Sequence, residues 1–280
     1  MSPSPDEKVR PKKRFGQNFL QDTHALDTIA RLCNANPEET IIEVGPGTGN
    51  LTASLLETPA AEIVAVERDS SLLPRLEKRF PGQRLTVHQG DAIHFDYAAH
   101  CPGPHRHVVA GNLPYNAATE IYFRLLEHRS RIRRVVLMFQ REVADRIVAP
   151  EGSKTYGTLS VMTALHARAR VALRLPPDAF HPAPKVHSAV IVADLSETHR
   201  FDIGGDELGF RRMIGAAFGA RRKTLANALS RGMWERNDVV EALAEIGASA
   251  TVRAEALAPE SLGALWCVLQ ARGLARPRGA

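Results

Sequence analysis

Short apolar runs that alternate with segments of helical periodicity dominate the chain from residue 40 to residue 166. Each run has the length of one strand, and consecutive apolar residues of this kind are typical of strands buried on both faces. Strand and helix signals in alternation indicate βαβ units and a mostly parallel sheet with helices on both sides. The expected strands are TIIEVG (40–45), EIVAVE (62–67), RLTVHQ (84–89), HVVAGN (107–112) and RRVVLMFQ (133–140), and the expected helices cover 49–57, 70–80, 117–128, 141–149 and 157–166.

The pattern changes after residue 166. ARVALRL (169–175) and HSAVIVADL (187–195) indicate two more strands, and the connection between them is too short for a crossover helix, so we expect them to pair antiparallel at one edge of the sheet. Beyond about residue 200 the apolar residues follow helical spacing with no strand signal. The sequence therefore predicts three parts: a basic flexible tail over 1–14, a doubly wound, Rossmann-like α/β domain over 15–199, and a small all-helical domain over 200–280.

A glycine-rich turn follows the first expected strand of the sheet. Gly45, Gly47 and Gly49 lie in IIEVGPGTGNLT, where the absence of a Cβ lets the backbone turn tightly and come close to a ligand. The spacing is G-x-G-x-G and differs from the G-x-G-x-x-G that holds a dinucleotide pyrophosphate, which points away from NAD. Glu67 ends the next strand, where it can accept hydrogen bonds from both hydroxyls of a ribose.

A second carboxylate lies on the same expected edge of the sheet. Asp91 in HQGDA follows the third strand and can accept a proton from an adenine amine, although an Asp at a loop start is also ordinary. Together Gly45, Glu67 and Asp91 describe a nucleoside pocket without a phosphate site. S-adenosylmethionine requires such a pocket, because it contains a nucleoside and no phosphate.

The run GNLPYN follows the fourth strand and has more chemistry than a turn requires. Asn112 supplies a side-chain carbonyl, and Leu113 supplies a backbone carbonyl next to Pro114, which has no N–H. Two such acceptors can hold an exocyclic amine and stabilise the positive charge that develops when the amine is alkylated. Tyr115 offers a ring on which a base can stack, worth roughly 1–3 kcal/mol per base.

Composition narrows the class of protein. The 36 Lys and Arg residues exceed the 31 Asp and Glu residues, and the formal charge of +5 favours a polyanionic partner without establishing one. Three scattered cysteines argue for a reducing compartment, and we find no secretory signal or membrane-length apolar run. We expect a cytoplasmic monomer that has no membrane contact.

One histidine-rich loop invites a zinc interpretation. HCPGPHRH contains His100, Cys101, His105 and His107, but this spacing matches no usual zinc-finger pattern, and the Pro and Gly residues indicate a loop. We expect no metal.

Eight segments, in order along the chain, resemble the bacterial KsgA/RsmA family of ribosomal RNA adenine dimethyltransferases. Each is moderately specific alone, and the eight in the same order are highly specific. They are KKRFGQNFLQD, IIEVGPGTGNLT, VAVERD, GDA, GNLPYN, MFQREVADRIVAPEGSKTYGTLSV, FHPAPKVHSAV and RRKTLANAL, which span about Lys12 to Leu229.

The resemblance implies S-adenosylmethionine as methyl donor and two adjacent adenines near the 3′ end of 16S ribosomal RNA as target. It implies a role for each matched residue. Asn18 and Leu20 would contact the methionine end of the cofactor, Gly45 and Gly47 would form its glycine loop, Glu67 would hold the ribose and Asp91 the adenine. Asn112 and the Leu113 carbonyl would bind the target amine, with Tyr115 and Phe180 on the two faces of the target base. For Phe180 the residues alone favour a core position, because it lies in a Pro-rich connection between two strands.

Two charge runs are candidates for contacts with RNA phosphates. One contains Arg131, Arg133 and Arg134, and the other Arg221, Arg222 and Lys223. Such runs are usually solvated faces, but in a chain expected to meet folded RNA we favour phosphate contacts.

Three other functions stay open at this point. The first is the related Erm-type methyltransferase, which modifies large-subunit RNA and gives macrolide resistance, and GNLPYN with FHPAPKV fits it less well. The second is a ribosome-assembly factor with little catalysis, which the intact Asn112 and Tyr115 disfavour. The third is a dehydrogenase, which the glycine spacing disfavours.

Overall fold

The computed structural model describes residues 12, 17–101, 106–231 and 234–274. Apart from Lys12, the expected basic tail over 1–14 lies outside the described residues. The chain forms two compact units, of which the first comprises Met1–Ala144 and Ala169–Glu197 and the second Asp145–Arg168 and Thr198–Ala280. The second unit thus takes in residues 145–168, which the sequence division at residue 200 had left in the α/β domain.

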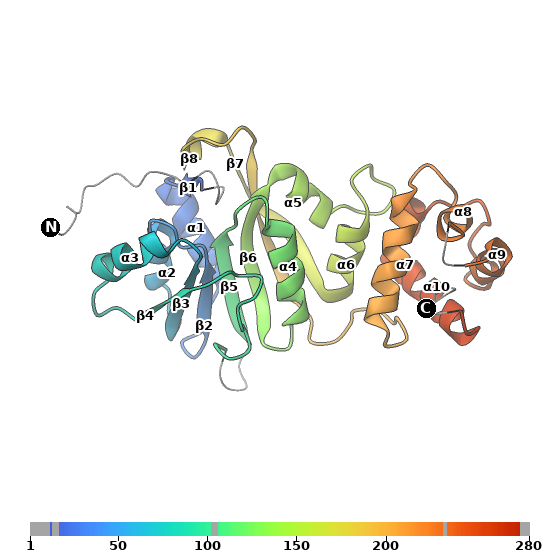
Figure 1. Ribbon diagram of the computed structural model, residues 1–280, viewed down its shortest axis with the longest axis horizontal. Coiled ribbons are helices and arrows are strands. Elements are labelled where there is room, and N and C mark those ends of the chain that lie inside the picture. Colours follow the sequence, from blue (N-terminus) through green and yellow to red (C-terminus); the bar gives the residue numbers. More distant parts are fainter. Residues whose placement is uncertain (1–11, 13–16, 102–105, 232–233, 275–280) are drawn as a thin grey trace. The chain divides into compact units, whose positions relative to one another are not determined.

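A seven-stranded sheet forms the centre of the first unit, counted over the described residues (Figure 1). Neighbouring strands pair parallel from β4 through β3, β2 and β5 to β6, and β9 then pairs antiparallel with β6. β7 forms the edge beyond β9. The strand bounds are β4 (Leu85–Gln89), β3 (Glu62–Glu67), β2 (Thr40–Val44), β5 (His107–Asn112), β6 (Ile132–Gln140), β9 (Ser188–Leu195) and β7 (Ala167–Leu175). The predicted strands and the mostly parallel sheet are confirmed, and the last two strands are neighbours as expected, with the antiparallel pairing observed between β9 and β6.

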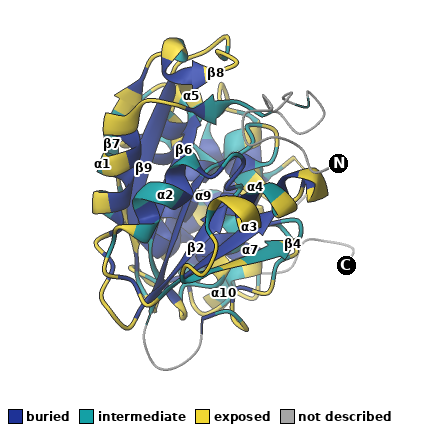
Figure 2. Ribbon diagram, turned by 90° about the vertical axis from the view of Figure 1, so that its left-hand side faces the viewer, coloured by how far each residue is buried: buried dark blue, intermediate teal, exposed yellow. Residues whose placement is uncertain are grey.

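Helices cover both faces of this sheet, as the doubly wound prediction requires. α1 (Thr23–Cys33) begins after Asp22, whose carboxylate accepts from the Ala25 N–H at 3.0 Å, and it packs with Val136 and Met138 in one core cluster. On the other face the ring of Tyr122 in α4 (Ala118–Glu127) meets that of Phe139 edge to face. Both faces of the central strands are therefore buried, and Figure 2 shows most of these strands in dark blue, while the edge strands β4 and β7 are partly exposed. The other helical segments between β2 and β4 along the chain are α2 (Asn50–Leu56), the 3₁₀ turn η2 (Ser70–Leu72) and α3 (Leu73–Arg79).

A small ribbon of two-residue strands was not predicted. β1 (Phe19–Leu20) pairs antiparallel with β8 (Phe180–His181), so that Leu20 lies opposite Phe180. The 3₁₀ turn η3 (Pro177–Ala179) precedes β8, and the Ala179 carbonyl accepts from the Gln21 N–H at 2.8 Å. The ribbon joins the N-terminal segment to the connection between β7 and β9.

The second unit is helical. Its core contains Phe210, Trp266 and Tyr156, all nearly inaccessible to solvent. Gly209 is required where two helices approach closely, because a Cβ there would come within 2.3 Å of the Trp266 ring. Among the described residues, no helix combines the length and apolar character needed to cross a membrane. The helices are the end of α5 (Arg141–Ile147), α6 (Thr158–His166), α7 (Glu207–Gly219), α8 (Leu225–Leu229), α9 (Arg236–Glu245), the 3₁₀ turn η4 (Ala254–Ala256) and α10 (Pro259–Ala271).

Candidate active site

A pocket opens at the carboxyl ends of β2, β3, β4 and β5, where ligands bind in open α/β sheets. It lies wholly within the first unit. Most of the predicted site residues line it together: Asn18, Gly45, Gly47, Glu67, Asp91, Asn112, Leu113, Pro114 and Tyr115. Leu20 and Phe180 do not.

The glycine loop needs its glycines for two separate reasons. Gly45, Gly47 and Gly49 all have positive φ (69°, 58° and 83°), a conformation that other residues adopt at a cost. A Cβ on Gly47 would also come within 2.8 Å of the Phe19 ring. The loop thus leaves space for the Phe19 ring, which lines the pocket. A side chain at Gly47 would occupy the space that this ring fills.

Glu67 ties the glycine loop to the end of β3. One carboxylate oxygen accepts from the Gly47 N–H at 3.0 Å and the other from the Asp69 N–H at 2.8 Å. Burial raises the pKa of this carboxyl. A carboxylate has about four acceptor positions, and the backbone N–H of Arg68 also donates to this one, so acceptor capacity remains for a ribose hydroxyl.

Asp91 is paired with a cation that the sequence analysis missed. Oδ1 of Asp91 accepts from the Ile93 N–H at 3.0 Å, and Oδ2 lies 3.4 Å from Nη1 of Arg68. Arg68 also lines the pocket. The sequence signal for Arg68 was its position directly after Glu67, a predicted site residue.

The amide of Asn112 has a defined orientation. Its Nδ2 donates to the backbone carbonyl of Asn18 at 2.7 Å. Because the nitrogen is committed to that bond, Oδ1 is the atom left to accept from a ligand amine. The N-terminal segment therefore orients the residue that the sequence analysis assigned to the target amine.

Tyr115 is held by a residue far along the chain. Its hydroxyl shares a 2.7 Å hydrogen bond with Oγ of Ser188, a fully buried residue at the start of β9. Burial raises the pKa of the Tyr115 phenol, so the ring remains neutral. Sequence analysis missed Ser188, since nothing in FHPAPKVHSAV marks which polar residue points to the pocket edge.

Leu20 and Phe180 lie in the hydrophobic core, each 4% exposed. They face each other in the β1–β8 register, while Asn18 and Phe19 of the same segment reach the pocket. The structure therefore does not bring the Phe180 ring to the pocket. Its backbone, in β8, supports the segment that is there.

The segment before β1 is fastened through Asp69, and Gln17 in it lines the pocket. Lys12 Nζ donates to Oδ1 of Asp69 at 2.7 Å, and Gln17 Nε2 donates to Oδ2 at 3.1 Å. Burial alone would raise the pKa of Asp69, but hydrogen bonds from Lys12, Ser71 and Gln17 hold it at about 2. Of the residues from Gln17 to Leu20, the sequence predicted Asn18 and Leu20 as site residues, whereas Gln17, Asn18 and Phe19 line the pocket.

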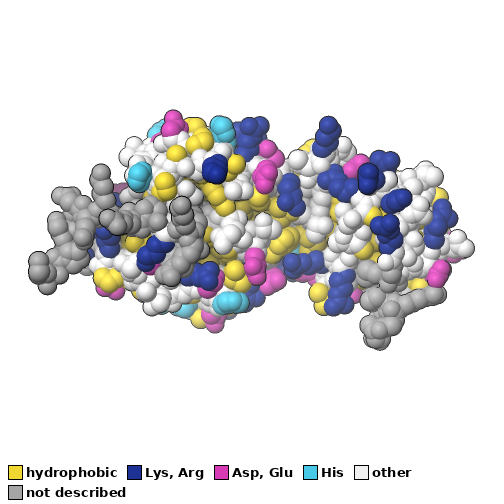
Figure 3. All heavy atoms as spheres, turned by 45° about the horizontal axis from the view of Figure 1, so that its top comes forward, with side chains coloured by type: hydrophobic (Ala, Val, Ile, Leu, Met, Phe, Trp, Pro, Cys, Tyr) yellow, Lys and Arg dark blue, Asp and Glu magenta, His cyan; other side chains and the backbone are white. Residues whose placement is uncertain are grey.

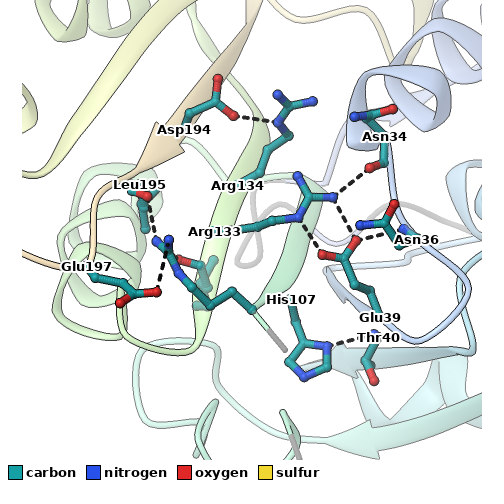
Figure 4. A network of polar contacts seen from close by, with 12 residues as sticks. Asn34, Asn36, Glu39, Thr40, His107, Arg133, Arg134, Asp194, Leu195 and Glu197 are labelled. Atoms are coloured by element: carbon teal, nitrogen blue, oxygen red, sulfur yellow. Dashed lines mark hydrogen bonds and ion pairs between the residues drawn. The ribbon is translucent and has the colours of Figure 1, made fainter. Parts of the chain in front are cut away.

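The first charge run lies at the opposite, amino ends of the strands (Figure 4). The Arg133 guanidinium forms a two-bonded pair with the Glu39 carboxylate and donates to the Asn34 carbonyl at 2.6 Å. Arg134 donates to Asp194 at 2.6 Å. Arg131 is exposed. Arg133 and Arg134 thus hold β6 to its surroundings.

In the same region Nδ1 of His107 accepts from the Thr40 N–H at 2.8 Å, and His105 of the histidine-rich loop lies outside the described residues.

The second charge run lies in the second unit, after α7. Arg221, Arg222 and Lys223 are exposed, and Arg221 pairs with Glu255 at 3.0 Å. Figure 3 shows many Lys and Arg side chains on one face of this helical unit.

A family model described as ribosomal RNA adenine dimethylase matches residues 8–261, which include the whole pocket and most of the helical unit. The chain belongs to this family. Enzymes of the family are methyltransferases that use S-adenosylmethionine as methyl donor.

Two curated relatives are similar to this chain over most of its length. The protein named "Ribosomal RNA small subunit methyltransferase A" from Syntrophotalea carbinolica is 42% identical over 93% of this chain and 97% of its own. The protein of the same name from Maricaulis maris is 44% identical over 88% of this chain and 86% of its own.

Two solved structures share the fold. A dimethyladenosine transferase from Plasmodium falciparum has a TM-score of 0.79 at 24% identity and covers 91% of this chain and 98% of its own. The 23S rRNA methyltransferase ErmE has a TM-score of 0.71 at 23% identity, with 90% and 100% covered. At these identities they show the fold alone, which is the predicted Rossmann-like one.

Proposed function

We propose that the chain transfers methyl groups to the exocyclic amines of two adjacent adenines in the 3′-terminal hairpin loop of 16S ribosomal RNA, during small-subunit biogenesis. The observation that carries the proposal is the Asn112 amide, fixed by the Asn18 carbonyl at the end of β5 in a pocket with two carboxylates. The names of the curated relatives support the small subunit as substrate. We further propose that the protein acts as a cytoplasmic monomer.

The pocket residues fit S-adenosylmethionine. Gly45 and Gly47 leave the space that a Cβ would fill, Glu67 has acceptor capacity for a ribose hydroxyl, and Asp91 accepts from the adenine amine. Asn18, and Leu20 through its backbone, lie on the segment assigned to the methionine end. When bound, the cofactor supplies a methyl group already activated on a positively charged sulfur.

The target amine is prepared by acceptors. Oδ1 of Asn112 and the Leu113 carbonyl accept its two hydrogens, which draws the nitrogen lone pair out of conjugation with the ring and stabilises the charge on nitrogen as the N–C bond forms. The bound cofactor would supply the methyl group and keep the electron pair of the S–C bond, and the surplus proton of the amine would pass to water. Tyr115, oriented by Ser188, stacks on the base.

We assign RNA binding to exposed arginine and lysine side chains. We assign phosphate contacts to Arg221, Arg222 and Lys223, with Arg131 as a fourth. Arg133 and Arg134 are left out of this set because their side chains, paired with Glu39 and Asp194, are only 22% and 20% exposed. The side chain of Arg221 also has an acidic partner, Glu255, but it is 41% exposed.

The test compares purified small and large ribosomal subunits that lack these methyl groups, using labelled S-adenosylmethionine. We expect label in the small subunit, and mass spectrometry of its RNA should find two dimethylated adenines. Label confined to the large subunit would support the Erm-type alternative, and subunit binding without label would support a non-catalytic assembly factor.

Asn112→Ala tests the assigned role in the same assay. We expect the rate to fall about 10²–10³-fold, as when one transition-state hydrogen-bond partner is removed, with subunit binding retained. Asn237→Ala, on the exposed face of α9, is the matched control and should methylate normally. Unaltered methylation by Asn112→Ala would refute the role.

A further inference from the structure

Two imidazoles and a carboxylate converge in the second unit, and none of these three residues is used in the proposed methyl transfer. Nε2 of His166 lies 3.0 Å from one oxygen of Glu207, and Nε2 of His199 lies 3.0 Å from the other. One ligand atom from each residue lies within 4.8 Å of the other two. From this cluster we propose a binding site for one divalent transition-metal ion, of which zinc is the type, ligated by His166, His199 and Glu207.

The donor set suits such an ion. Zinc accepts imidazole nitrogen at about 2.0–2.1 Å and carboxylate oxygen at about 2.0–2.2 Å, and sites with two histidines and one glutamate keep a fourth position for water. Ligand atoms that share an ion at those distances, with angles of 90–110°, are about 3.0–3.4 Å apart. The two N···O separations of 3.0 Å are in that range, although each imidazole contacts a different oxygen of Glu207. The three ligand atoms lie within 4.8 Å of one another, so the side chains would rotate to bring both imidazoles onto one ion.

Two of the three ligands lie at helix ends, and the third, His199, lies in the connection between β9 and α7. His166 is the last residue of α6, and Glu207 is the first of α7, whose start is fixed by Asp206 accepting from the Gly209 N–H at 2.9 Å. His199 is adjacent to Arg200, whose N–H donates to the Leu165 carbonyl at 2.9 Å. Ligands on elements fixed in this way lose little conformational freedom on binding.

Charge and access are also compatible with a cation. The Arg200 guanidinium donates to the Ala164 and Ala167 carbonyls, so its charge is committed to the end of α6. His166 is 2% exposed, while the side chains of His199 and Glu207 are 22% and 32% exposed. His166 therefore forms the buried side of the site, and the solvent-exposed side, at His199 and Glu207, gives access to an ion and a water ligand.

The alternative is a pair of metal-free imidazole–carboxylate hydrogen bonds, and direct metal binding separates the two. We would strip the full-length protein with a chelator and titrate it with Zn²⁺ by calorimetry at neutral pH. We expect one ion per chain and a rise of the thermal midpoint with Zn²⁺. His199→Asn and Glu207→Gln should each weaken binding at least tenfold, while His24→Asn and Glu57→Gln, at exposed positions in the first unit, should not.

Substitution of Co²⁺ identifies the ligand atoms. A site built from His166, His199 and Glu207 gives visible bands without the thiolate charge-transfer band that coordination by Cys33, Cys101 or Cys267 would add. Circular dichroism checks that each variant is folded, and if His199→Asn does not fold, Glu207→Gln alone decides. Absence of saturable binding, equal binding by Glu207→Gln, or a thiolate band would overturn the proposal.

Discussion

At the scale of single residues, the Tyr115–Ser188 hydrogen bond converts a flexible ring into a fixed surface. Ser188 does not line the pocket, so its removal should act through Tyr115. We expect Ser188→Ala to lower kcat for methylation by roughly fivefold, the equivalent of one hydrogen bond of about 1 kcal/mol, and to leave cofactor affinity unchanged. Steady-state kinetics and calorimetry measure the two quantities.

Tyr115→Phe removes the same bond from the other side and keeps the ring. In a double-mutant cycle the two substitutions should be non-additive, because either one abolishes the interaction. Additive losses would show that Ser188 acts by another route.

Glu43 is a second residue whose surroundings have a measurable consequence. This carboxyl is fully buried in β2, where burial raises its pKa to about 8, although Thr52 donates to it at 2.6 Å. Between pH 4.5, the ordinary pKa of a glutamate, and about pH 8, the native state holds a proton that the unfolded state has lost. The free energy of unfolding should therefore fall as pH rises through this window.

Glu43→Gln has no proton to lose, so its unfolding free energy should fall less steeply with pH than that of the unmodified chain. Urea denaturation at several pH values across the window measures the difference between the two proteins. Glu57→Gln, at an exposed position, should run parallel to the unmodified chain. If Glu43→Gln also runs parallel, Glu43 is already ionised in the native state.

At the scale of elements, β1 acts as a strap: it holds the Phe19 ring against the glycine loop at Gly47. Gly47→Ala would place a Cβ 2.8 Å from the Phe19 ring and strain a backbone with φ of 58°. We expect it to weaken S-adenosylmethionine binding at least tenfold by displacing the strap, and to cost about 1 kcal/mol of stability through the strain. Calorimetric titration and thermal denaturation measure these effects.

Gly82→Ala is the matched control. Its φ of 67° carries similar strain, but no atom lies within 4 Å of the added Cβ. It should lose similar stability and keep full cofactor affinity. Equal loss of affinity in both variants would mean that backbone strain, and not the contact with Phe19, is responsible.

The same elements show what sequence can and cannot predict. The central parallel strands β2, β3 and β5 are buried on both faces, so their apolar runs are continuous, and the bounds of the parallel strands agree with prediction within two residues. A two-residue strand such as β1 has no periodicity to detect, and its pairing with β8 decides that Phe19 reaches the pocket while Leu20 and Phe180 enter the core. Arg133 is similar, because its partner Glu39 lies 94 residues away. Helical spacing predicts α6 but not the unit to which it belongs.

At the scale of the whole molecule, the excess of positive charge matters where it is exposed. Arg222 and Lys223 are exposed in the helical unit, and each phosphate contact releases a counterion when RNA binds. If both contact phosphates, Arg222→Gln with Lys223→Gln should lower the slope of log affinity against log salt concentration by about 1.4–1.8. The rate of methylation at saturating RNA should stay unchanged, because neither residue lines the pocket.

Arg168→Gln with Arg170→Gln removes the same charge from exposed positions on β7 and serves as the control. Filter binding to small-subunit RNA over a series of salt concentrations gives the slope for each protein. If the two double variants lose equal slope, net charge alone governs binding. A loss confined to Arg222 and Lys223 means that RNA is read by a specific face of the helical unit, which leaves the pocket of the other unit free for the target adenines.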